Sequence, residues 1–260
     1  MESFYSNQLK RNWKYRVYLP NSYKKDNTKY YEILYLLHGH GGNEDVWIKY
    51  GNVNRILDRL YNEDKIRDFI VIMPDGGNSW YVDGVENMES AIIKDLIPKI
   101  EKYYRVKIGR QYRSIGGMSA GGYGSLRFVL KYPELFINGI LMSPSAYYPL
   151  PDSNSSAITG VDSFKDANGN FSEDLWKTYN YDNYWNIFDS SNCKPHNFYI
   201  SVGTDDIFKS IIKIVNEQLP AAFSKRSANV FLDIKNYNGG HDMGVWKQAF
   251  EYAITQIYKK

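Results

Sequence analysis

The segment Arg113-Ser114-Ile115-Gly116-Gly117-Met118-Ser119-Ala120-Gly121 decides the fold. A short run without charges ends just before Ser119 and a helical pattern opens just after it, which predicts a strand over 113–118 and a helix over 120–132. Residues 117–121 have the form G-x-S-x-G. In such a turn, small flanking residues keep neighbouring chain away from a strained serine whose hydroxyl stands exposed above the sheet. The segment therefore predicts an α/β fold with a nucleophilic serine at the carboxyl end of a strand.

Outward from this segment, short β-branched or aromatic runs alternate with amphipathic segments of helix length. This pattern predicts a mostly parallel sheet with helices on both faces. About eight strands are expected, near residues 3–9, 12–19, 31–37, 69–73, 113–118, 137–143, 196–203 and 229–235. Helices are expected near residues 52–62, 89–104, 120–132, 207–219 and 242–258. The first two strands should form an antiparallel hairpin at one edge, and residues 1–260 are expected to form a single domain because no repeat or linker divides them.

The region 144–195 breaks this alternation. It carries prolines, a run rich in serine and asparagine, and many aromatic residues. A stretch this long between two strands is usually functional, so we expect a lid-like or substrate-binding insertion in which Tyr147 and Trp185 contact the substrate. Trp80 and Tyr81 follow another predicted strand, and they either wall the same site or form an aromatic pair in the core.

Composition and charge exclude several kinds of partner. The 260 residues include 32 Lys+Arg and 29 Asp+Glu, and a net charge of +3 is too small to indicate a nucleic-acid or anionic-membrane partner. The longest apolar runs, near 33–37 and 69–73, are far shorter than the roughly 20 residues that cross a bilayer. Residues 1–7 lack the features of a signal peptide, so we expect a cytoplasmic protein, or a secreted one if a leader has been removed. Cys193 is the only cysteine and is expected to be inert.

A serine hydroxyl is a weak nucleophile until a base takes its proton, so a histidine is expected downstream of Ser119. The chain has four histidines, and His241 follows the last predicted strand and its turn, where a loop reaches the carboxyl edge of the sheet. His196 begins a strand and so lies at the opposite edge, where a surface or core role fits it better. We therefore expect His241 to be the base.

A carboxylate that orients the base is expected in the loop after the strand at 196–203. This loop holds the adjacent residues Asp205 and Asp206, whose side chains point in different directions. We favour Asp206 as the partner of His241 and expect Asp205 to cap the next helix or to lie in its first turn. The order Ser119, Asp206, His241 is that of the α/β-hydrolases.

Two N–H groups should stabilise the oxyanion that develops during acyl transfer. One is the backbone N–H of Ala120, the residue after the serine. The second is expected from the glycine-rich loop after the strand at 31–37, and we assign it to the N–H of His40. His38 and His40 also form a His-x-His pair, but no third metal ligand is evident, so neither a metal nor another cofactor is expected.

Segments spread over nearly the whole chain carry a family resemblance. They are Leu36-Leu37-His38-Gly39, Met73-Pro74-Asp75-Gly76, Ser79-Trp80-Tyr81, Gly117-Met118-Ser119-Ala120-Gly121-Gly122-Tyr123-Gly124, Gly203-Thr204-Asp205-Asp206 and Gly240-His241. The chain resembles the esterase D-like α/β-hydrolases, which include feruloyl, acetylxylan and tributyrin esterases and mycolyl transferases. The resemblance implies Asp206 as the carboxylate and His40 as an oxyanion donor. S-formylglutathione hydrolases of this family carry a cysteine in the loop corresponding to residues 38–42, so that activity is not expected.

Taken together, the candidate residues and the resemblance imply a serine carboxylic-ester hydrolase that works through an acyl-enzyme. The expected substrates are hydroxycinnamoyl esters, such as feruloylated polysaccharides, or short-chain acyl and acetyl esters, including acetylated sugars. An acyltransferase that uses the same residues is the alternative. A non-catalytic binding protein is a remote one, because such a chain is expected to have lost one of the three catalytic residues. Trp47 and Trp246 are expected to be packing residues.

Overall fold

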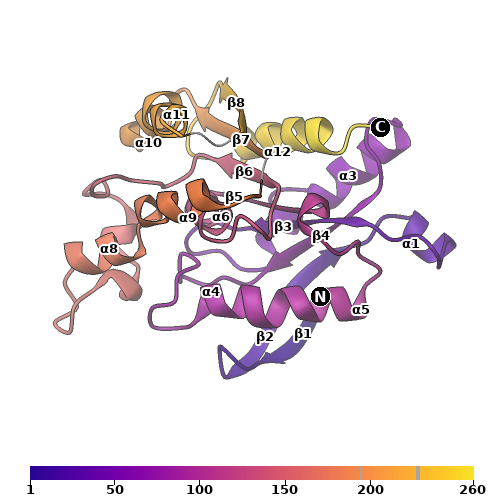
Figure 1. Cartoon of the computed structure of the whole chain (residues 1–260), viewed down its shortest axis with the longest axis horizontal. Helices are drawn as coiled ribbons and strands as arrows, with labels where there is room; N and C mark the ends of the chain where they lie inside the picture. Colours follow the sequence, from indigo (N-terminus) through magenta and orange to yellow (C-terminus); the bar gives the residue numbers. More distant parts are fainter. Residues whose placement is uncertain (194, 227–228) are drawn as a thin grey trace.

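The fold is built on a sheet that is flanked by helices on both sides (Figure 1). The computed structural model describes residues 1–193, 195–226 and 229–260. Eight strands are hydrogen-bonded in the order β1-β2-β4-β3-β5-β6-β7-β8. Their bounds are β1 Glu2–Ser6, β2 Arg11–Tyr18, β3 Glu32–Leu37, β4 Phe69–Pro74, β5 Arg113–Met118, β6 Asn138–Met142, β7 His196–Gly203 and β8 Val230–Tyr237.

The sheet is antiparallel at one edge and parallel elsewhere. β1 pairs with β2 and β2 with β4 in antiparallel register, whereas the pairs from β4–β3 to β7–β8 are parallel. The prediction of a mostly parallel, eight-stranded sheet with an edge hairpin is confirmed. β1 ends earlier than expected, at Ser6, because residues 7–10 form the hairpin turn and Lys10 takes a φ of 55°.

Helices fill the connections between the strands. Their bounds are α1 Ser22–Lys25, α2 Val46–Lys49, α3 Val53–Asn62, α4 Met88–Ser90, α5 Ile97–Tyr103, α6 Ala120–Lys131, α7 Ser156–Thr159, α8 Glu173–Tyr179, α9 Trp185–Ser190, α10 Lys209–Lys213, α11 Leu219–Ser224 and α12 Met243–Ile257. π-helical segments at Ala91–Leu96 and Ile214–Gln218 join α4 to α5 and α10 to α11. The second of these joined helices extends to Ser224, past the predicted end at residue 219.

A proline explains this difference. Pro220 lies in the first turn of α11, directly after the π-helical segment, and Pro98 lies in the same position in α5. Proline has no N–H to donate and its ring clashes with the carbonyl of the preceding turn. A wider π-helical turn before the proline accommodates both defects, so the helix continues where the sequence pattern predicts its end.

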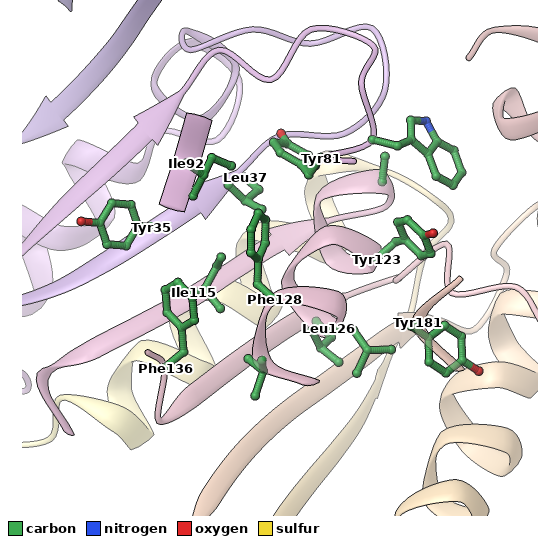
Figure 2. Packing of buried hydrophobic residues seen from close by; sticks show 14 of the residues in the cluster. Tyr35, Leu37, Tyr81, Ile92, Ile115, Tyr123, Leu126, Phe128, Phe136 and Tyr181 are labelled. Carbon is green, nitrogen blue, oxygen red and sulfur yellow. The ribbon is translucent and has the colours of Figure 1, made fainter. Parts of the chain in front are cut away.

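Each face of the sheet has its own hydrophobic core. Along β3, Ile33 and Tyr35 pack into one cluster, whereas Leu34 and Leu36 pack into the other. This alternation follows from the two-residue period of a strand. The first cluster includes residues of α4 to α6, and Figure 2 shows such packing around Tyr35, Ile92 and Phe128. The second includes residues of α3 and α12, so the prediction of helices on both faces is confirmed.

The region 144–195 connects β6 to β7 and carries α7, α8 and α9. Most of its aromatic side chains are buried in the first core cluster (Tyr147, Phe164, Trp176, Tyr181, Trp185 and Phe188). Trp176 stacks on Tyr123 of α6 with ring centroids 5.6 Å apart. The segment is thus packed against the sheet domain through its rings, and its role as a lid stays a prediction. No helix among the described residues has both the length and the apolar character needed to cross a membrane.

Candidate active site

Ser119 stands at a sharp turn between β5 and α6. Its φ is 53° and its ψ is −117°, a conformation that costs energy for any residue other than glycine. The surrounding chain holds it there, because its N–H donates to the carbonyl of Met142 (2.8 Å) and its carbonyl accepts from the N–H of Ser145 (3.1 Å). This is the strand–turn–helix arrangement expected from the G-x-S-x-G segment.

The two glycines of this segment are required by close contacts. A Cβ atom on Gly117 would lie 2.5 Å from the carbonyl carbon of Gly121. A Cβ atom on Gly121 would lie 2.6 Å from the carbonyl oxygens of both Leu37 and His38. Both obstacles are backbone atoms, which cannot move aside as a flexible side chain can. Glycine therefore lets the turn lie directly against the loop after β3.

The structure brings Ser119, His241 and Asp206 into one hydrogen-bonded chain. His241 Nε2 lies 2.8 Å from Ser119 Oγ, and His241 Nδ1 lies 2.8 Å from Asp206 Oδ2. An ionised carboxylate only accepts hydrogen bonds, so Nδ1 carries the proton and Nε2 accepts from the serine hydroxyl. Asp206 is fully buried, and its second oxygen accepts from the N–H of Phe208 (2.9 Å). The base is thus held in the tautomer that can take a proton from Ser119.

Asp205 points away from this chain. Its carboxylate is exposed and accepts from the Thr204 hydroxyl at 3.1 Å. The expectation that it caps a helix or lies in the first helical turn is wrong. α10 begins only at Lys209, its N-cap residue is Phe208, and its first turn contains no acidic residue. Residues 204–208 separate the end of β7 from the start of α10. Within this segment it is Asp206, and not Asp205, that accepts from the N–H of Phe208.

Two aromatic rings flank the imidazole of His241. The rings of Phe208 and Trp246 lie 4.9 and 5.0 Å from it and meet it edge-to-face. Asp242, next in sequence, caps α12 by accepting from the N–H groups of Gly244 (2.7 Å) and Val245 (3.2 Å). Capping anchors the residue after the base to a rigid helix. Side-chain packing and capping together fix where His241 can lie.

His38 shapes the loop that follows β3. Its Nδ1 donates to the carbonyl of Gly39 (2.7 Å) and its Nε2 accepts from the N–H of Gly76 (2.8 Å). Its own carbonyl accepts from the hydroxyl of Tyr81 (2.8 Å). Burial lowers the pKa of His38, which keeps the ring neutral as this bonding pattern requires. Both ring nitrogens are therefore occupied by backbone groups, and His38 acts as a structural residue of the loop.

His40 extends from the same loop toward the insertion. Its Nδ1 accepts from the indole N–H of Trp80 (3.3 Å), and burial lowers its pKa. A Cβ on Gly160 would lie 2.7 Å from His40 Nε2, so the ring rests directly against the end of α7. The described residues contain no group of three or more His, Cys, Asp or Glu side chains arranged to hold a metal ion. The His38-x-His40 pair has backbone, tryptophan and glycine neighbours instead.

The two expected oxyanion donors come from α6 and from the loop after β3. Ala120 is the first residue of α6, where N–H groups have no partner within the helix. His40 lines the same cavity as Ser119. The glycine before it approaches the serine closely, because a Cβ on Gly39 would be 3.4 Å from Ser119 Cβ. The N–H of Gly41 donates to Asn78 Oδ1 (2.9 Å), which holds this loop in place.

A cavity of about 480 Å³ opens in front of Ser119 and His241. Besides these two residues, it is lined by Gly39, His40, Gly41, Gly42, Val46, Tyr50, Met118, Ser156, Phe208, Met243 and Trp246. Tyr50 is 65% exposed and so lies at the rim. Ser156 is the contribution of the insertion, from α7. The lining is mainly apolar, with three aromatic side chains.

The four aromatic residues expected to contact the substrate are absent from the lining of this cavity. Trp80 lies behind the loop, bonded to His40, and packs against Trp176. Tyr81 is buried and fixes the loop carbonyl described above. Trp80 and Tyr81 are therefore core aromatics that support the loop, which is the second of the two roles expected for them, and their contact with substrate stays a prediction.

Tyr147 and Trp185 are also absent from the lining of this cavity, and their contact with substrate stays a prediction. Tyr147 is 1% exposed. Trp185 meets the ring of Phe223 at 5.1 Å and lies under the guanidinium of Arg226 at 4.6 Å, which places it in the core between the insertion and α11. Trp246 is predicted to be a packing residue, but in the structure it lines the cavity. Trp47 is buried, as a packing residue should be.

His196 and Cys193 lie away from the cavity. His196 is buried at the start of β7, and its Nδ1 faces the guanidinium of Arg110 at 3.1 Å. Cys193 lies in the connection just before β7 and is partly buried. β7 delivers Asp206 from its opposite end, so both residues are separated from the site by the length of the strand. The inertness of Cys193 stays a prediction.

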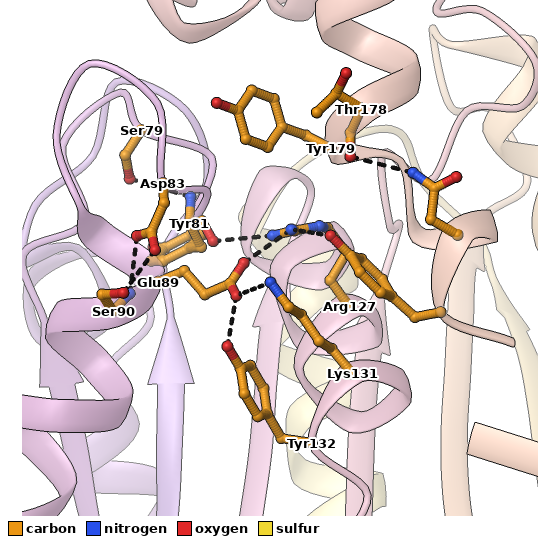
Figure 3. A network of polar contacts seen from close by, with 12 residues as sticks. Ser79, Tyr81, Asp83, Glu89, Ser90, Arg127, Lys131, Tyr132, Thr178 and Tyr179 are labelled. Carbon is orange, nitrogen blue, oxygen red and sulfur yellow. Dashed lines mark hydrogen bonds and ion pairs between the residues drawn. The ribbon is translucent and has the colours of Figure 1, made fainter. Parts of the chain in front are cut away.

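A buried ion-pair network contacts Tyr81, whose hydroxyl holds the loop after β3 (Figure 3). Arg127 of α6 donates to Glu89 (2.8 Å) and to the carbonyl of Tyr81 (3.1 Å). Glu89 also accepts from Lys131 and from the hydroxyl of Tyr132 (2.7 Å). Burial alone would raise the pKa of Glu89, but the cations outweigh it and the pKa is lowered. The network therefore ties α4, α6 and the Tyr81 segment together.

Comparisons with known proteins agree with this geometry. The Esterase family model, described as "Putative esterase", matches residues 6–257. An acetyl esterase from Caldicellulosiruptor saccharolyticus is 27% identical over 99% of this chain and 97% of that protein. An endo-1,4-beta-xylanase/feruloyl esterase from Xylanibacter ruminicola is 35% identical over 51% of this chain, and the match spans only 20% of that relative's length. The structure of the fluorophosphonate-binding serine hydrolase F of Staphylococcus aureus is similar with a TM-score of 0.78 at 19% identity, covering 100% of this chain and 97% of that one.

These findings carry different weight. Similarity to a solved structure at 19% identity shows the fold, here that of the α/β-hydrolases. The family match extends over nearly the whole chain, from Ser6 at the end of β1 to Ile257 at the end of α12. The esterase D-like resemblance expected from the motifs is thereby confirmed. The chain belongs to the Esterase family of α/β-hydrolases.

Proposed function

We propose that the chain is a serine carboxylic-ester hydrolase that works through an acyl-enzyme intermediate. One observation carries this proposal: the hydrogen-bonded chain Ser119–His241–Asp206 ends at an apolar cavity. Ser119 lines the cavity and its hydroxyl is hydrogen-bonded to a histidine, which can take its proton. The names of the acetyl esterase and the feruloyl esterase relatives support the same class of reaction.

The geometry supports the following reaction steps. Ser119 Oγ attacks the ester carbonyl while its proton moves to His241 Nε2, and the carbonyl π electrons move onto the carbonyl oxygen. The C–O bond to the alcohol then breaks, and His241 gives its proton to the departing alkoxide. A water molecule attacks the acyl-enzyme in the same way, and its proton returns through His241 to Ser119 Oγ. Asp206 stabilises the imidazolium that forms in both halves.

The negative carbonyl oxygen requires donors that are in place before the reaction starts. We assign them to the backbone N–H groups of Ala120 and His40. The first belongs to the helix that follows the serine, and the second belongs to the loop held by Tyr81 and Asn78. Removing one such donor typically costs 10²- to 10³-fold in kcat, on the order of 3 to 4 kcal/mol.

The size and lining of the cavity favour a substrate with a small acyl group. A volume of about 480 Å³ falls in the range of small-molecule sites, roughly 300–1,000 Å³. Tyr50, Phe208 and Trp246 give it aromatic walls, which suit a hydroxycinnamoyl ring, and their apolar neighbours also suit a short acyl chain. We propose hydroxycinnamoyl or short-chain acyl esters, including those of carbohydrates, as substrates.

Hydrolysis is favoured over acyl transfer by the openness of the site. Tyr50 at the rim is 65% exposed, so water reaches the cavity. An acyltransferase needs water excluded from the acyl-enzyme and an acceptor alcohol bound in its place. Adding a sugar alcohol during turnover tests this point, because a transferase forms the acylated sugar in preference to the free acid.

The proposed function is tested by the hydrolysis of p-nitrophenyl acetate, p-nitrophenyl butyrate and methyl ferulate, measured side by side with Ser119→Ala as control. We expect turnover of at least one ester by the natural chain and loss of nearly all turnover in the variant. A higher kcat/KM for methyl ferulate would indicate that the aromatic walls of the cavity bind the ring of the acyl group. Turnover of the activated short esters alone assigns the cavity to short acyl chains. Retained turnover in Ser119→Ala contradicts the proposal.

A further inference from the structure

A second serine hydroxyl lies beside the nucleophile. Ser145 Oγ is 3.2 Å from Ser119 Oγ, and the Ser145 side chain is almost fully buried, with 3% exposure. The backbones of the two residues are also joined, because the N–H of Ser145 donates to the carbonyl of Ser119. Ser145 follows β6, so a separate strand delivers this hydroxyl to the turn after β5. The contact therefore belongs to the site and does not arise from the G-x-S-x-G segment.

The direction of this hydrogen bond follows from the rest of the chain. Ser119 has one hydroxyl proton, and the tautomer fixed by Asp206 makes His241 Nε2 its acceptor. Ser119 Oγ therefore has only lone pairs to offer to a second neighbour. Ser145 must be the donor across the 3.2 Å contact.

A buried tyrosine hydroxyl neighbours the Ser145 hydroxyl. Tyr147 is 1% exposed, and burial raises its pKa to about 12, while hydrogen bonding to the hydroxyls of Ser155 and Ser145 acts in the opposite direction. The Ser145 hydroxyl therefore has two polar neighbours, the hydroxyls of Ser119 and Tyr147.

We propose that Ser145 is a further catalytic residue, which donates a hydrogen bond to Ser119 Oγ and stabilises the negative charge that develops there during acyl transfer. The inference rests on the proposed function. In acylation, Oγ gives its proton to His241 as the C–O bond forms. In deacylation, that bond breaks and the electron pair returns to Oγ before the proton does. Ser145 donates in both steps, whereas the N–H groups of the oxyanion hole act on the carbonyl oxygen.

The test replaces Ser145 and measures steady-state kinetics with p-nitrophenyl acetate. We expect Ser145→Ala to lower kcat about 10- to 100-fold, the factor for a hydrogen bond to a charged group, with KM within about twofold. Tyr147→Phe should lower kcat by a few-fold, since it removes a polar neighbour of the Ser145 hydroxyl but leaves the donor to Ser119 in place. Ser125→Ala is the matched control, because Ser125 is equally buried but donates to a helix carbonyl (2.7 Å), and its kcat should stay within about twofold.

The outcomes separate this inference from the proposed function. If the natural chain hydrolyses no ester, the proposed function fails. If it does and folded Ser145→Ala keeps its kcat within about twofold, or changes only in KM, the role of Ser145 is overturned. Thermal melting of each variant shows whether it is folded. If Ser145→Ala does not fold, Tyr147→Phe decides in its place, and an unchanged kcat there overturns the inference.

Discussion

Breaking the buried ion pair between Glu89 and Arg127 should lower the free energy of unfolding, by an amount that follows from the burial of the pair. Glu89 is 2% exposed and Arg127 1% exposed, and both are held by further polar groups (Figure 3). Glu89→Gln keeps the shape of the side chain but removes its charge. Arg127 then remains buried without an ionised partner, because its other acceptors are the carbonyl of Tyr81 and the hydroxyl of Tyr184. A cation left in this state is destabilising.

Removing one partner of a buried ion pair costs about 3–5 kcal/mol. A surface pair costs about 0–1 kcal/mol. Glu86→Gln supplies that comparison, because Glu86 pairs with Arg11 through two hydrogen bonds of 2.9 Å but has a side chain that is 41% exposed. Glu89→Gln should therefore lower the melting temperature by roughly 6 to 20 °C, and Glu86→Gln by roughly 4 °C at most.

Urea unfolding at pH 7 measures this difference directly. We expect Glu89→Gln to lower the free energy of unfolding by about 3–5 kcal/mol with an unchanged m-value, which shows that the denatured state is not altered. The control variant should lose less than about 1 kcal/mol. Equal losses in the two variants, or a loss below about 1 kcal/mol in Glu89→Gln, would refute the reasoning that burial makes this pair costly to break.

The same contact predicts how stability depends on pH. The pKa of Glu89 is lowered in the folded chain, with burial opposing the shift and Arg127 and Lys131 producing it. A carboxyl with a lowered folded pKa contributes stability above its unfolded pKa of about 4.3 and loses that contribution as the pH falls through the folded value. The stability difference between the natural chain and Glu89→Gln should therefore narrow below about pH 4.3. A constant difference down to pH 2 would contradict this.

Two further substitutions test the site. Asp206→Asn should lower kcat about 10⁴-fold, because an amide can hold the imidazole in the wrong tautomer, whereas the exposed Asp205→Asn should change kcat less than about twofold; similar losses in ester hydrolysis assays would contradict the assignment. Tyr50→Ala should lower kcat/KM for methyl ferulate about 2- to 10-fold and leave p-nitrophenyl acetate unchanged, since it removes an aromatic wall. Tyr103→Ala, at a similarly exposed ring on α5, is the control, and an equal effect there would refute the role of the rim.

The sheet and the serine turn are predictable because their signals are local. The two-residue alternation along β3 separates the two cores, and G-x-S-x-G directly encodes the close contacts at Gly117 and Gly121. The position of Asp206 follows from its place after β7. The end of α11 is not predictable from such signals, because a π-helical segment absorbs the effect of Pro220.

Which residues line the cavity depends on tertiary packing, so the sequence pattern does not predict them. Tyr50 follows the four-residue helix α2, which is too short to show an apolar period. Trp246 lies on α12, where its apolar neighbours make it read as a core residue. Conversely, Trp185 is an aromatic residue of the insertion that the sequence suggests for binding, but it packs in the core against Phe223 of α11. Aromatic rings that line a cavity and rings that fill a core have the same chemistry, so only their directions distinguish them.

The position of Ser145 beside Ser119 is not predictable from the sequence for a different reason. It follows β6 and is 26 residues from Ser119 in sequence, so no motif links the two hydroxyls. Neighbouring parallel strands bring them together, because β5 and β6 pair from Ser114 to Met118 and end at the same edge. Residues just beyond the carboxyl ends of adjacent strands are therefore candidates for one site even without a shared motif.

The central claim is that Ser119 forms an acyl-enzyme, and mass spectrometry of the protein during turnover tests it most directly. The chain is mixed with p-nitrophenyl acetate, quenched in acid within the first turnovers and digested for peptide mapping. We predict one acetyl group per chain, located on Ser119, that disappears as the ester is consumed and is absent from Ser119→Ala. Turnover of the ester without an acyl group on Ser119, or an acyl group on another residue that forms and decays at the turnover rate, would contradict the account.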